Sequence, residues 1–212
     1  MDWRTWIRQS LPRTEIMRGG ATVWEKGAKG LLGDTLGPVM HAHDQASEVF
    51  YFVAGRCRLE IGNSEEFSSP GDFVRVPPNT PHNLWNAGDD DLLVFWIVAP
   101  HFANNKWYTE PSVPGAMERR ALRSHIAPGA NLPSNAQIQS RMLTLNAMYS
   151  GQTAVGQEAV LYVVDGQADV KVGKLGGRLT ANDFVHVPVD TVYSVTPVSG
   201  APSVMMFEMP GG

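Results

Sequence analysis

The sequence predicts an all-β protein in which one β-unit occurs twice along the chain. Its 21 glycines and 15 prolines divide the 212 residues into short segments rich in Val, Phe, Tyr, Trp and Leu. Short segments of this composition between turn residues are typical of β-strands. The second half of the chain also repeats the first half without a gap. Two copies of a unit of about 100 residues each would account for the chain length.

Strands are expected throughout the first copy. They cover Ala21–Glu25, Val39–His43, Glu48–Ala54, Arg56–Ile61, Asp72–Val76, His82–Asn86 and Leu92–Val98. The sequences GNS, PGD, PPNTP and AGDDD separate the later segments. Their Gly, Pro, Asn and Asp residues favour tight turns between strands.

The repeat is visible as a constant shift of 111 residues (166 minus 55) between Gly55 and Gly166. The same shift relates Gly62 to Gly173, Asp72 to Asp183, Phe73 to Phe184, Val74 to Val185, Val76 to Val187, Pro77 to Pro188 and Thr80 to Thr191. A repeated pattern with a fixed period indicates a repeated structural unit. The second copy is therefore expected to adopt the fold of the first.

Two segments lie outside the repeated units. Trp3, Trp6, Ile7 and Leu11 recur at helical spacing before Pro12, which predicts a short amphipathic helix. Residues 101–137 are polar and contain Pro and Ala, as expected of a connection. The predicted division is a helical segment at 1–18, a first barrel-sized unit at 19–100, the connection at 101–137 and a second unit at 138–212.

Composition limits the classes of function. The formal net charge of −4 and the absence of a basic cluster argue against a nucleic-acid partner. The single cysteine, Cys57, alternates with Leu59 and Ile61 as in a strand, so a buried and unreactive thiol is expected. The N-terminus lacks the apolar core of a signal peptide, and no apolar run approaches the roughly 20 residues that span a bilayer. A cytoplasmic protein without a membrane partner is therefore expected.

Four residues of the first copy predict a metal site. His41 and His43 are two residues apart, so on a strand both imidazoles leave from one face. The polar sequence DQAS then reads as a turn, which allows Glu48 on the next strand to point back at the same place. His82 follows the PPNTP turn and begins a further strand. Three imidazoles and one carboxylate suit Fe, Mn, Ni, Cu or Zn, whereas Ca and Mg prefer mostly oxygen ligands.

These residues resemble the two motifs of the cupin superfamily. The first motif matches with four residues between the second histidine and the glutamate, and the second motif matches in register. The matching residues are His41, His43, Glu48 and Gly55, followed by Gly71, Pro77, His82 and Asn86. Asn79 stands where the second motif has a glycine, and Asn also accepts left-handed backbone geometry. Gly37 lies nearer to His41 than the glycine of the family pattern does.

The resemblance implies a bicupin, with two tandem jelly-roll barrels in one chain. The first barrel would bind the metal ion. At the positions 111 residues later, the four ligands correspond to Gln152, Ala154, Ala159 and Tyr193. The second barrel is therefore expected to be metal-free. Glu158 and His186 lie nearby and are interpreted as structural residues. Since cupins are often dimers, the resemblance also implies a homodimer.

Function follows from the vacant coordination positions that four protein ligands leave on an ion that favours five or six. A mostly apolar wall with few fixed cations is expected around the ion, formed by Phe50, Phe52, Leu59, Leu84 and Trp96. A small apolar or aromatic substrate with an enol, phenol or carbonyl oxygen would suit this wall.

The leading hypothesis is a dioxygenase similar to quercetinase-like and diketone-cleaving cupins, with Fe(II) slightly favoured and Glu48 able to act as a base. A metal-dependent isomerase, lyase or decarboxylase is an alternative, because a bound ion can also act as a Lewis acid. A non-catalytic cupin that binds a small ligand or a metal is a further alternative. The fold by itself does not choose among these functions.

Overall fold

A computed structural model describes residues 10–25, 40–62, 64–101, 105–108, 118–121 and 132–210. The described residues contain strands and turns and no helix, which confirms the predicted all-β class. Three residues of the predicted N-terminal helix, Trp3, Trp6 and Ile7, lie outside the described part. Leu11 is buried in an irregular segment, where its backbone N–H donates a 2.9 Å hydrogen bond to the Gly19 carbonyl.

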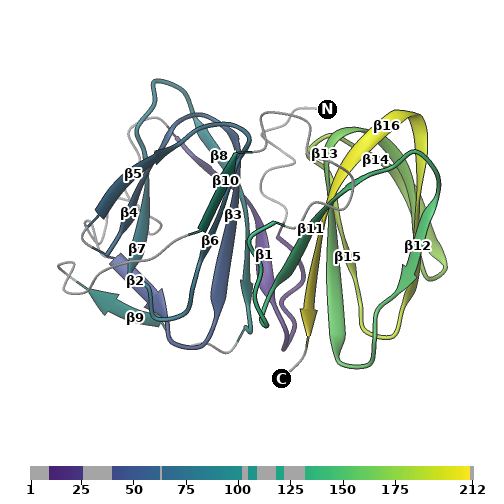
Figure 1. The fold of residues 1–212 in the computed structure, drawn as a ribbon, viewed down its shortest axis with the longest axis horizontal. Coiled ribbons are helices and arrows are strands. Elements are labelled where there is room, and N and C mark those ends of the chain that lie inside the picture. The colour runs from purple at the N-terminus through teal and green to yellow at the C-terminus, as the bar shows by residue number, and fades with distance from the viewer. Residues whose placement is uncertain are drawn as a thin grey trace. The chain divides into compact units, whose positions relative to one another are not determined.

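The chain divides into two compact units, Met1–Arg123 and Ser124–Gly212. In the first unit, ten antiparallel strands form two sheets that enclose a core (Figure 1). One sheet consists, in spatial order, of β1 (Arg18–Trp24), β8 (Leu92–Ala99), β3 (Ser47–Ala54), β6 (Asp72–Val76) and β10 (Glu118–Ala121). The other consists of β5 (Ser64–Ser68), β4 (Cys57–Ile61), β7 (His82–Asn86), β2 (Met40–His43) and β9 (Asn105–Tyr108).

All seven strands expected in the first copy are present, and β6 and β7 have the expected bounds. Three further strands, β5, β9 and β10, were not expected. The first four residues of β5, Ser64–Phe67, are exposed, so this edge strand lacks the alternation of apolar and polar residues that marks a half-buried strand. Strands β9 and β10 lie within residues 101–137 and pair with β2 and β6. The segment expected to connect the two copies thus also completes both sheets of the first unit.

Alternate residues of the two sheets fill the core of the first unit. Phe50 and Phe52 on β3 meet Leu59 on β4 and Leu84 on β7, and all four side chains have no exposed surface. The period of two along each strand sends these side chains inward and their neighbours to the other face. Cys57 belongs to the same core with 0% exposure, so its thiol is buried as expected.

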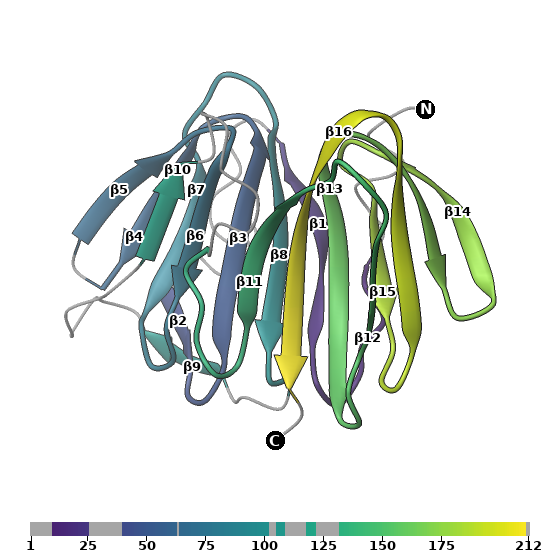
Figure 2. The ribbon, with the colours of Figure 1, turned by 45° about the vertical axis from the view of Figure 1, so that its right-hand side comes forward.

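The second unit is also an antiparallel β-structure (Figure 2). Its strands are β11 (Gln139–Thr144), β12 (Tyr149–Gln152), β13 (Gln157–Val172), β14 (Leu175–Thr180), β15 (Phe184–Val187) and β16 (Val192–Pro210). Strand β13 covers the residues that match both β3 and β4, and it pairs with β15 through its first half and with β14 through its second half. The β13 and β16 ladder shifts register between Val163 and Ala168, on either side of Gly166.

The backbone repeats at the glycines that the sequence aligns. Gly55 and Gly166 have φ angles of +81° and +82°, and Gly62 and Gly173 both have +57°. A side chain at Gly55 would also meet backbone, because an added Cβ would lie 2.6 Å from the Asp91 carbonyl oxygen. Glycine is required there both for the left-handed conformation and for the close approach.

No helix in the described part of the chain has the length and hydrophobicity needed to cross a membrane.

Candidate metal centre

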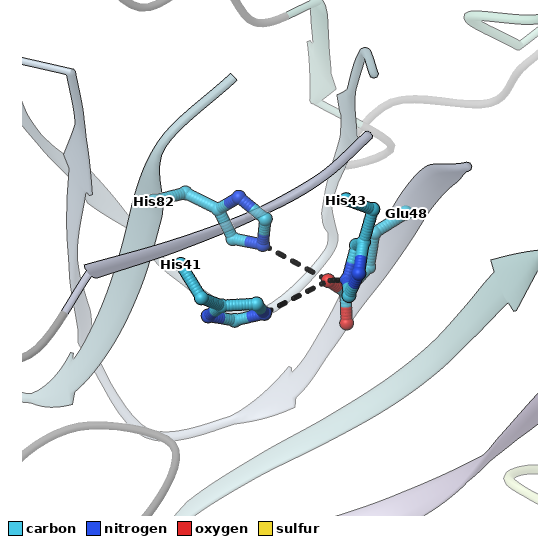
Figure 3. Close-up of side chains that lie close together, drawn as sticks. All are labelled: His41, His43, Glu48 and His82. Atoms are coloured by element: carbon cyan, nitrogen blue, oxygen red, sulfur yellow. Dashed lines mark hydrogen bonds and ion pairs between the residues drawn. The ribbon is translucent and has the colours of Figure 1, made fainter. Parts of the chain in front are cut away.

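The predicted ligands His41, His43, Glu48 and His82 lie together inside the first unit (Figure 3). His41 and His43 leave the same face of β2, and His41 is the direct partner of His82 on the neighbouring strand β7. One sheet therefore supplies all three imidazoles. The pairing of β2 with β7 explains how residues 41 positions apart in the chain (82 minus 41) become neighbours.

Glu48 reaches the histidines from the opposite sheet. Strand β2 ends at His43, residues 44–46 form the predicted turn, and β3 begins at Ser47. Glu48 shares the inward face of β3 with Phe50 and Phe52, which belong to the core. The turn thus changes sheets and lets the carboxylate face the imidazoles across the interior.

The four donor groups are buried and close together. The Nε2 atoms of His43 and His82 each lie 2.9 Å from Glu48 Oε2, and His41 Nε2 lies 3.8 Å from the same oxygen. One donor atom from each residue lies within 4.8 Å of every other. None of the four residues is more than 6% exposed. Such a group of donors in an apolar interior needs a balancing interaction, because buried polar groups are costly unless they are satisfied.

The surroundings of His82 fit a bound cation. Its Nδ1 lies 2.8 Å from the Thr80 carbonyl oxygen, and its Nε2 lies 2.9 Å from the Glu48 carboxylate. Both partners accept hydrogen bonds, whereas a neutral imidazole carries only one N–H. With Nδ1–H donating to Thr80, the Nε2 lone pair points at a carboxylate unless a cation lies between them. A hydrogen bond from the ring nitrogen that does not bind the metal, like the one from Nδ1 to the Thr80 carbonyl, is typical of metal-binding histidines.

The spacing also fits a transition-metal ion. Adjacent ligands of a six-coordinate ion with bonds of about 2.1 Å lie about 3 Å apart. The separations of 2.9 Å from Glu48 Oε2 to His43 and to His82 match this distance. The four residues thus form a site that can hold a divalent metal ion, as expected from the sequence.

The protonation states favour metal binding as well. Burial, together with the neighbouring charge of His82, lowers the pKa of His41 to about 3. Burial alone would raise the pKa of Glu48, but its close contacts with the imidazoles of His43 and His82 outweigh this effect, and the pKa lies well below its usual value. At neutral pH His41 is therefore a neutral imidazole and Glu48 a carboxylate, the forms that coordinate metal ions.

Asn79 joins the two turns that carry the ligands. Its backbone N–H donates a 2.7 Å hydrogen bond to the His43 carbonyl, and its Nδ2 donates a 2.8 Å bond to the Asp44 carbonyl. Lys106 Nζ in turn donates to Asn79 Oδ1 at 3.1 Å. Asn79 has a φ of +58°, which is the left-handed geometry expected at this position. The turn before His82 is thereby fastened to the turn between His43 and Glu48.

The predicted wall residues lie in or beside the core. Phe50, Phe52, Leu59 and Leu84 are fully buried in it, while Trp96 is half-buried and donates from Nε1 to Thr22 Oγ1 at 2.9 Å. Phe50 is the one of these with a ring near a ligand, 6.0 Å from the ring centre of His82. A role of these five residues in lining a substrate pocket stays a prediction.

Arg18 is a charged residue near this site that the sequence motifs did not indicate. Arg18 lies at the start of β1, three residues before the predicted strand, and its partner on β8 is Val98. Val98 is in turn the partner of Glu48 on β3. Extending the inward alternation of Trp24 and Thr22 back along the chain would have identified Arg18 as an inward-facing residue. Few fixed cations were expected around the ion, and Arg18 is one such cation.

The counterparts of the ligands in the second unit have a different chemistry. Tyr193 takes the place of His82, is 3% exposed, and places its hydroxyl 3.3 Å from Met206 Sδ. Burial, with a contribution from Tyr149, raises the pKa of Tyr193 well above its usual value. His186 Nε2 lies 3.3 Å from Glu158 Oε2, on the face of the strands that points away from the core of this unit. The phenol thus fills a position that a metal ligand occupies in the first unit.

Comparisons with known proteins agree with this geometry. Residues 32–98 match the cupin domain family. An uncharacterized protein, MJ1618, from Methanocaldococcus jannaschii is 29% identical over 84 residues, which cover 37% of this chain and 67% of that protein.

Several solved structures share the fold at low sequence identity. Salicylate 1,2-dioxygenase from Pseudaminobacter salicylatoxidans superposes with a TM-score of 0.73 at 12% identity, covering 94% of this chain and 75% of that chain. A mutant form of oxalate decarboxylase OxdC from Bacillus subtilis superposes with a TM-score of 0.56 at 14% identity, covering 93% and 70%. The domain match and the His and Glu cluster identify residues 32–98 as a cupin domain, and the fold of these solved structures extends over most of the chain.

Proposed function

We propose that this protein is a metal-dependent enzyme that acts on a small molecule through an enol, phenol or carbonyl oxygen, and that its reaction is a dioxygenation. The observation that carries the proposal is the buried cluster of His41, His43, Glu48 and His82. Four protein donors leave coordination positions for outside molecules on an ion that favours five or six ligands. The fold is shared with salicylate 1,2-dioxygenase and is therefore compatible with an oxygenase.

The chain contributes positioning and charge to this chemistry. The hydrogen bond from His82 to the Thr80 carbonyl fixes the ring and its tautomer. Phe50, with no exposed surface, keeps water from the core side of the site. A bound transition-metal ion would supply Lewis acidity and, for a redox-active metal such as Fe(II), the ability to react with dioxygen. Among Fe, Mn, Ni, Cu and Zn, we slightly favour Fe(II) for an oxygenase.

Glu48 has two proposed roles. Its carboxylate is held between His43 and His82 and serves first as a ligand. Because the pKa of Glu48 is lowered, it is a weak base and accepts a proton only from a group already made acidic by coordination. A substrate enol or phenol is such a group, so Glu48 is the proposed proton acceptor.

The test combines metal analysis with oxygen uptake. The full chain is purified without added metal, its metal content is measured, and the Fe(II)-loaded protein is mixed with a flavonol, a 1,3-diketone and 2-hydroxybenzoate. Consumption of dioxygen with formation of a cleaved product by the wild type, and not by a His43→Ala variant, would support the dioxygenase. Product formation under anaerobic conditions would instead support an isomerase, lyase or decarboxylase. Saturable binding without any product would contradict an enzymatic function.

A further inference from the structure

Arg18, Val98 and Glu48 form one row across three neighbouring strands. Arg18 on β1 pairs with Val98 on β8, and Val98 pairs with Glu48 on β3. Residues that pair directly in an antiparallel sheet extend from the same face. Adjacent strands are about 4.8 Å apart, so the backbone of Arg18 lies about 10 Å from that of Glu48. Arg18 is thus level with Glu48, the ligand that this sheet supplies to the candidate metal centre.

The shared face of this row is the inner face of the first unit. Trp24 on β1, Val94 on β8 and Phe50 on β3 all belong to the core. Along each strand, the core residue is an even number of residues from the residue of the row, which is Arg18, Val98 or Glu48 respectively. With a strand period of two, Arg18 therefore points into the interior.

The guanidinium of Arg18 has unused hydrogen-bonding capacity. Its Nε is buried and has no hydrogen-bond partner among the described residues. An unsatisfied buried donor destabilises the folded protein, and more so when the group is charged. The next inward residue on β1 is Gly20, which pairs with Trp96 and places no side chain beside Arg18. A cationic group with a spare donor therefore faces the site from β1.

The second unit lacks both the ligand and the cation of this row. There the corresponding row is Gln139 on β11, Glu208 on β16 and Ala159 on β13. Ala159 replaces the ligand Glu48, and Gln139 replaces Arg18. The second unit thus has no arginine at the position that matches Arg18, and its own inward-facing arginine, Arg141, lies two residues further along β11 and pairs with the Glu208 carboxylate at 3.3 Å.

We infer that Arg18 binds a carboxylate group of the substrate while an enol or phenol oxygen of the same molecule faces the metal ligands. This inference rests on the proposed function, because it takes the metal centre as the substrate site. The planar guanidinium pairs with a carboxylate through parallel N–H bonds and so also fixes the orientation of the substrate. The expected substrate class is a small planar acid with a hydroxyl or carbonyl oxygen near its carboxylate.

The test measures binding rather than turnover. Isothermal titration of the full, metal-loaded protein compares 2-hydroxybenzoate with 2-hydroxybenzamide, and acetoacetate with acetoacetamide. Hydrogen bonds to charged groups predict that at least one acid binds about tenfold or more tightly than its amide. In Arg18→Met this preference should fall to about twofold or less, and Arg18→Lys should restore part of it, because Lys keeps the charge without the planar fork.

A matched control is Arg141→Met in the second unit. Arg141 lies on β11 opposite Met206, a core residue of that unit, and is thus also an inward-facing arginine. This variant should keep the wild-type preference for both acids. Metal content is measured for every variant.

The outcomes separate this inference from the proposed function. Equal affinity for acid and amide in both pairs, an unchanged preference in Arg18→Met, or loss of the metal in that variant would overturn the role of Arg18. A preference that depends on Arg18 without any oxygen uptake would support the inference and contradict the dioxygenase. Oxygen uptake with a preference for the acid that does not depend on Arg18 would support the dioxygenase and contradict the role of Arg18.

Discussion

Glu48 is the residue on which the candidate metal centre depends. Its Oε2 atom lies 2.9 Å from His43 and from His82, although these residues come from two strands of the opposite sheet. These close contacts keep Glu48 ionised in spite of its burial. A carboxylate among imidazoles is compensated when a cation joins them, so metal binding and stability are expected to be linked at this site.

The first prediction concerns His43→Ala. In the wild type, an ion at a thousand times its dissociation constant should add about 4 kcal/mol to the free energy of unfolding. The variant should lose this gain because one of the four donors is absent. It should still fold, at a cost of about 1–3 kcal/mol for a buried side chain that leaves its partner unpaired. Denaturant unfolding with and without Mn²⁺ or Zn²⁺ measures both quantities.

The control for this prediction is His186→Ala, which removes a histidine of the second unit that lies outside the metal cluster. It should keep the full response to metal. A His43→Ala protein that is equally stabilised by the ion would exclude His43 as a ligand.

The second prediction concerns Tyr193→Phe at high pH. Burial raises the pKa of Tyr193 in the folded protein well above the 10.0 of an ordinary tyrosine. Above pH 10 the unfolded chain releases this proton and the folded chain keeps it. The free energy of unfolding therefore falls as pH rises above 10, by at most about 1.4 kcal/mol per pH unit from this residue.

The Phe variant lacks the ionisable hydroxyl, so its stability should decline less steeply between pH 10 and 11. Urea unfolding of both proteins at several pH values measures the two slopes. Parallel curves would show that Tyr193 is accessible to solvent in the native state.

At the scale of the elements, the site is built from two turns held against each other. The turn before β7 approaches the turn between β2 and β3 through the hydrogen bonds of Asn79. The second unit keeps only the backbone part of this contact, from Asp190 N–H to the Ala154 carbonyl at 3.4 Å. The Asp190 side chain instead accepts a hydrogen bond from Gln152. The backbone contact thus belongs to the shared fold, and the side-chain contact to the metal-binding unit.

The third prediction follows from this difference. Asn79→Gly should keep the left-handed turn, since glycine adopts positive φ without strain. It removes the Nδ2 donor to the Asp44 carbonyl, so the two ligand-bearing turns become less well fixed. Loss of such supporting contacts lowers metal affinity by about tenfold or more. Competition with a chelator for Zn²⁺ measures the change.

Asp190→Gly in the second unit is the matched control, with a φ of +50° at the equivalent position. It should leave zinc affinity unchanged. Equal affinity of Asn79→Gly and the wild type would show that the side-chain contact has no positioning role.

At the scale of the whole molecule, one chain contains the same backbone twice with two different interiors. The first unit holds a polar cluster above an apolar core, and the second fills the matching position with Tyr193. Metal binding should therefore stabilise one unit directly. The dimer that the family resemblance implies also belongs to this scale, and light scattering of the purified chain measures the number of subunits.

The fourth prediction is that the ion protects a limited part of the chain. On addition of Mn²⁺ or Zn²⁺, amide hydrogen exchange should slow in β2, β3 and β7, which carry the ligands. Exchange in β13 and β16 should change much less, because these strands supply no ligand. Mass spectrometry of peptic fragments measures both regions in one sample. Equal protection of the two regions would contradict a metal site confined to the first unit.

Local sequence patterns determined much of this protein. The alternation around Phe50 and Phe52 indicated an inward face, the Gly and Pro residues indicated turns, and the shift of 111 residues from Gly55 to Gly166 indicated the repeat. His41 and His43 could be assigned to one side of a strand because the strand period is two. These features depend on neighbours in the chain, so the sequence alone was sufficient to predict them.

Tertiary structure decided what depends on pairing between distant strands. The edge strand β5 has no inward face to mark it, and β9 and β10 are strands because β2 and β6 lie beside them. Arg18 joins the row of Glu48 only through Val98, which lies between them in the sheet. The distances of the donors from Glu48 likewise depend on how two sheets face each other. Such arrangements result from the register and packing of the whole fold, which no local pattern encodes.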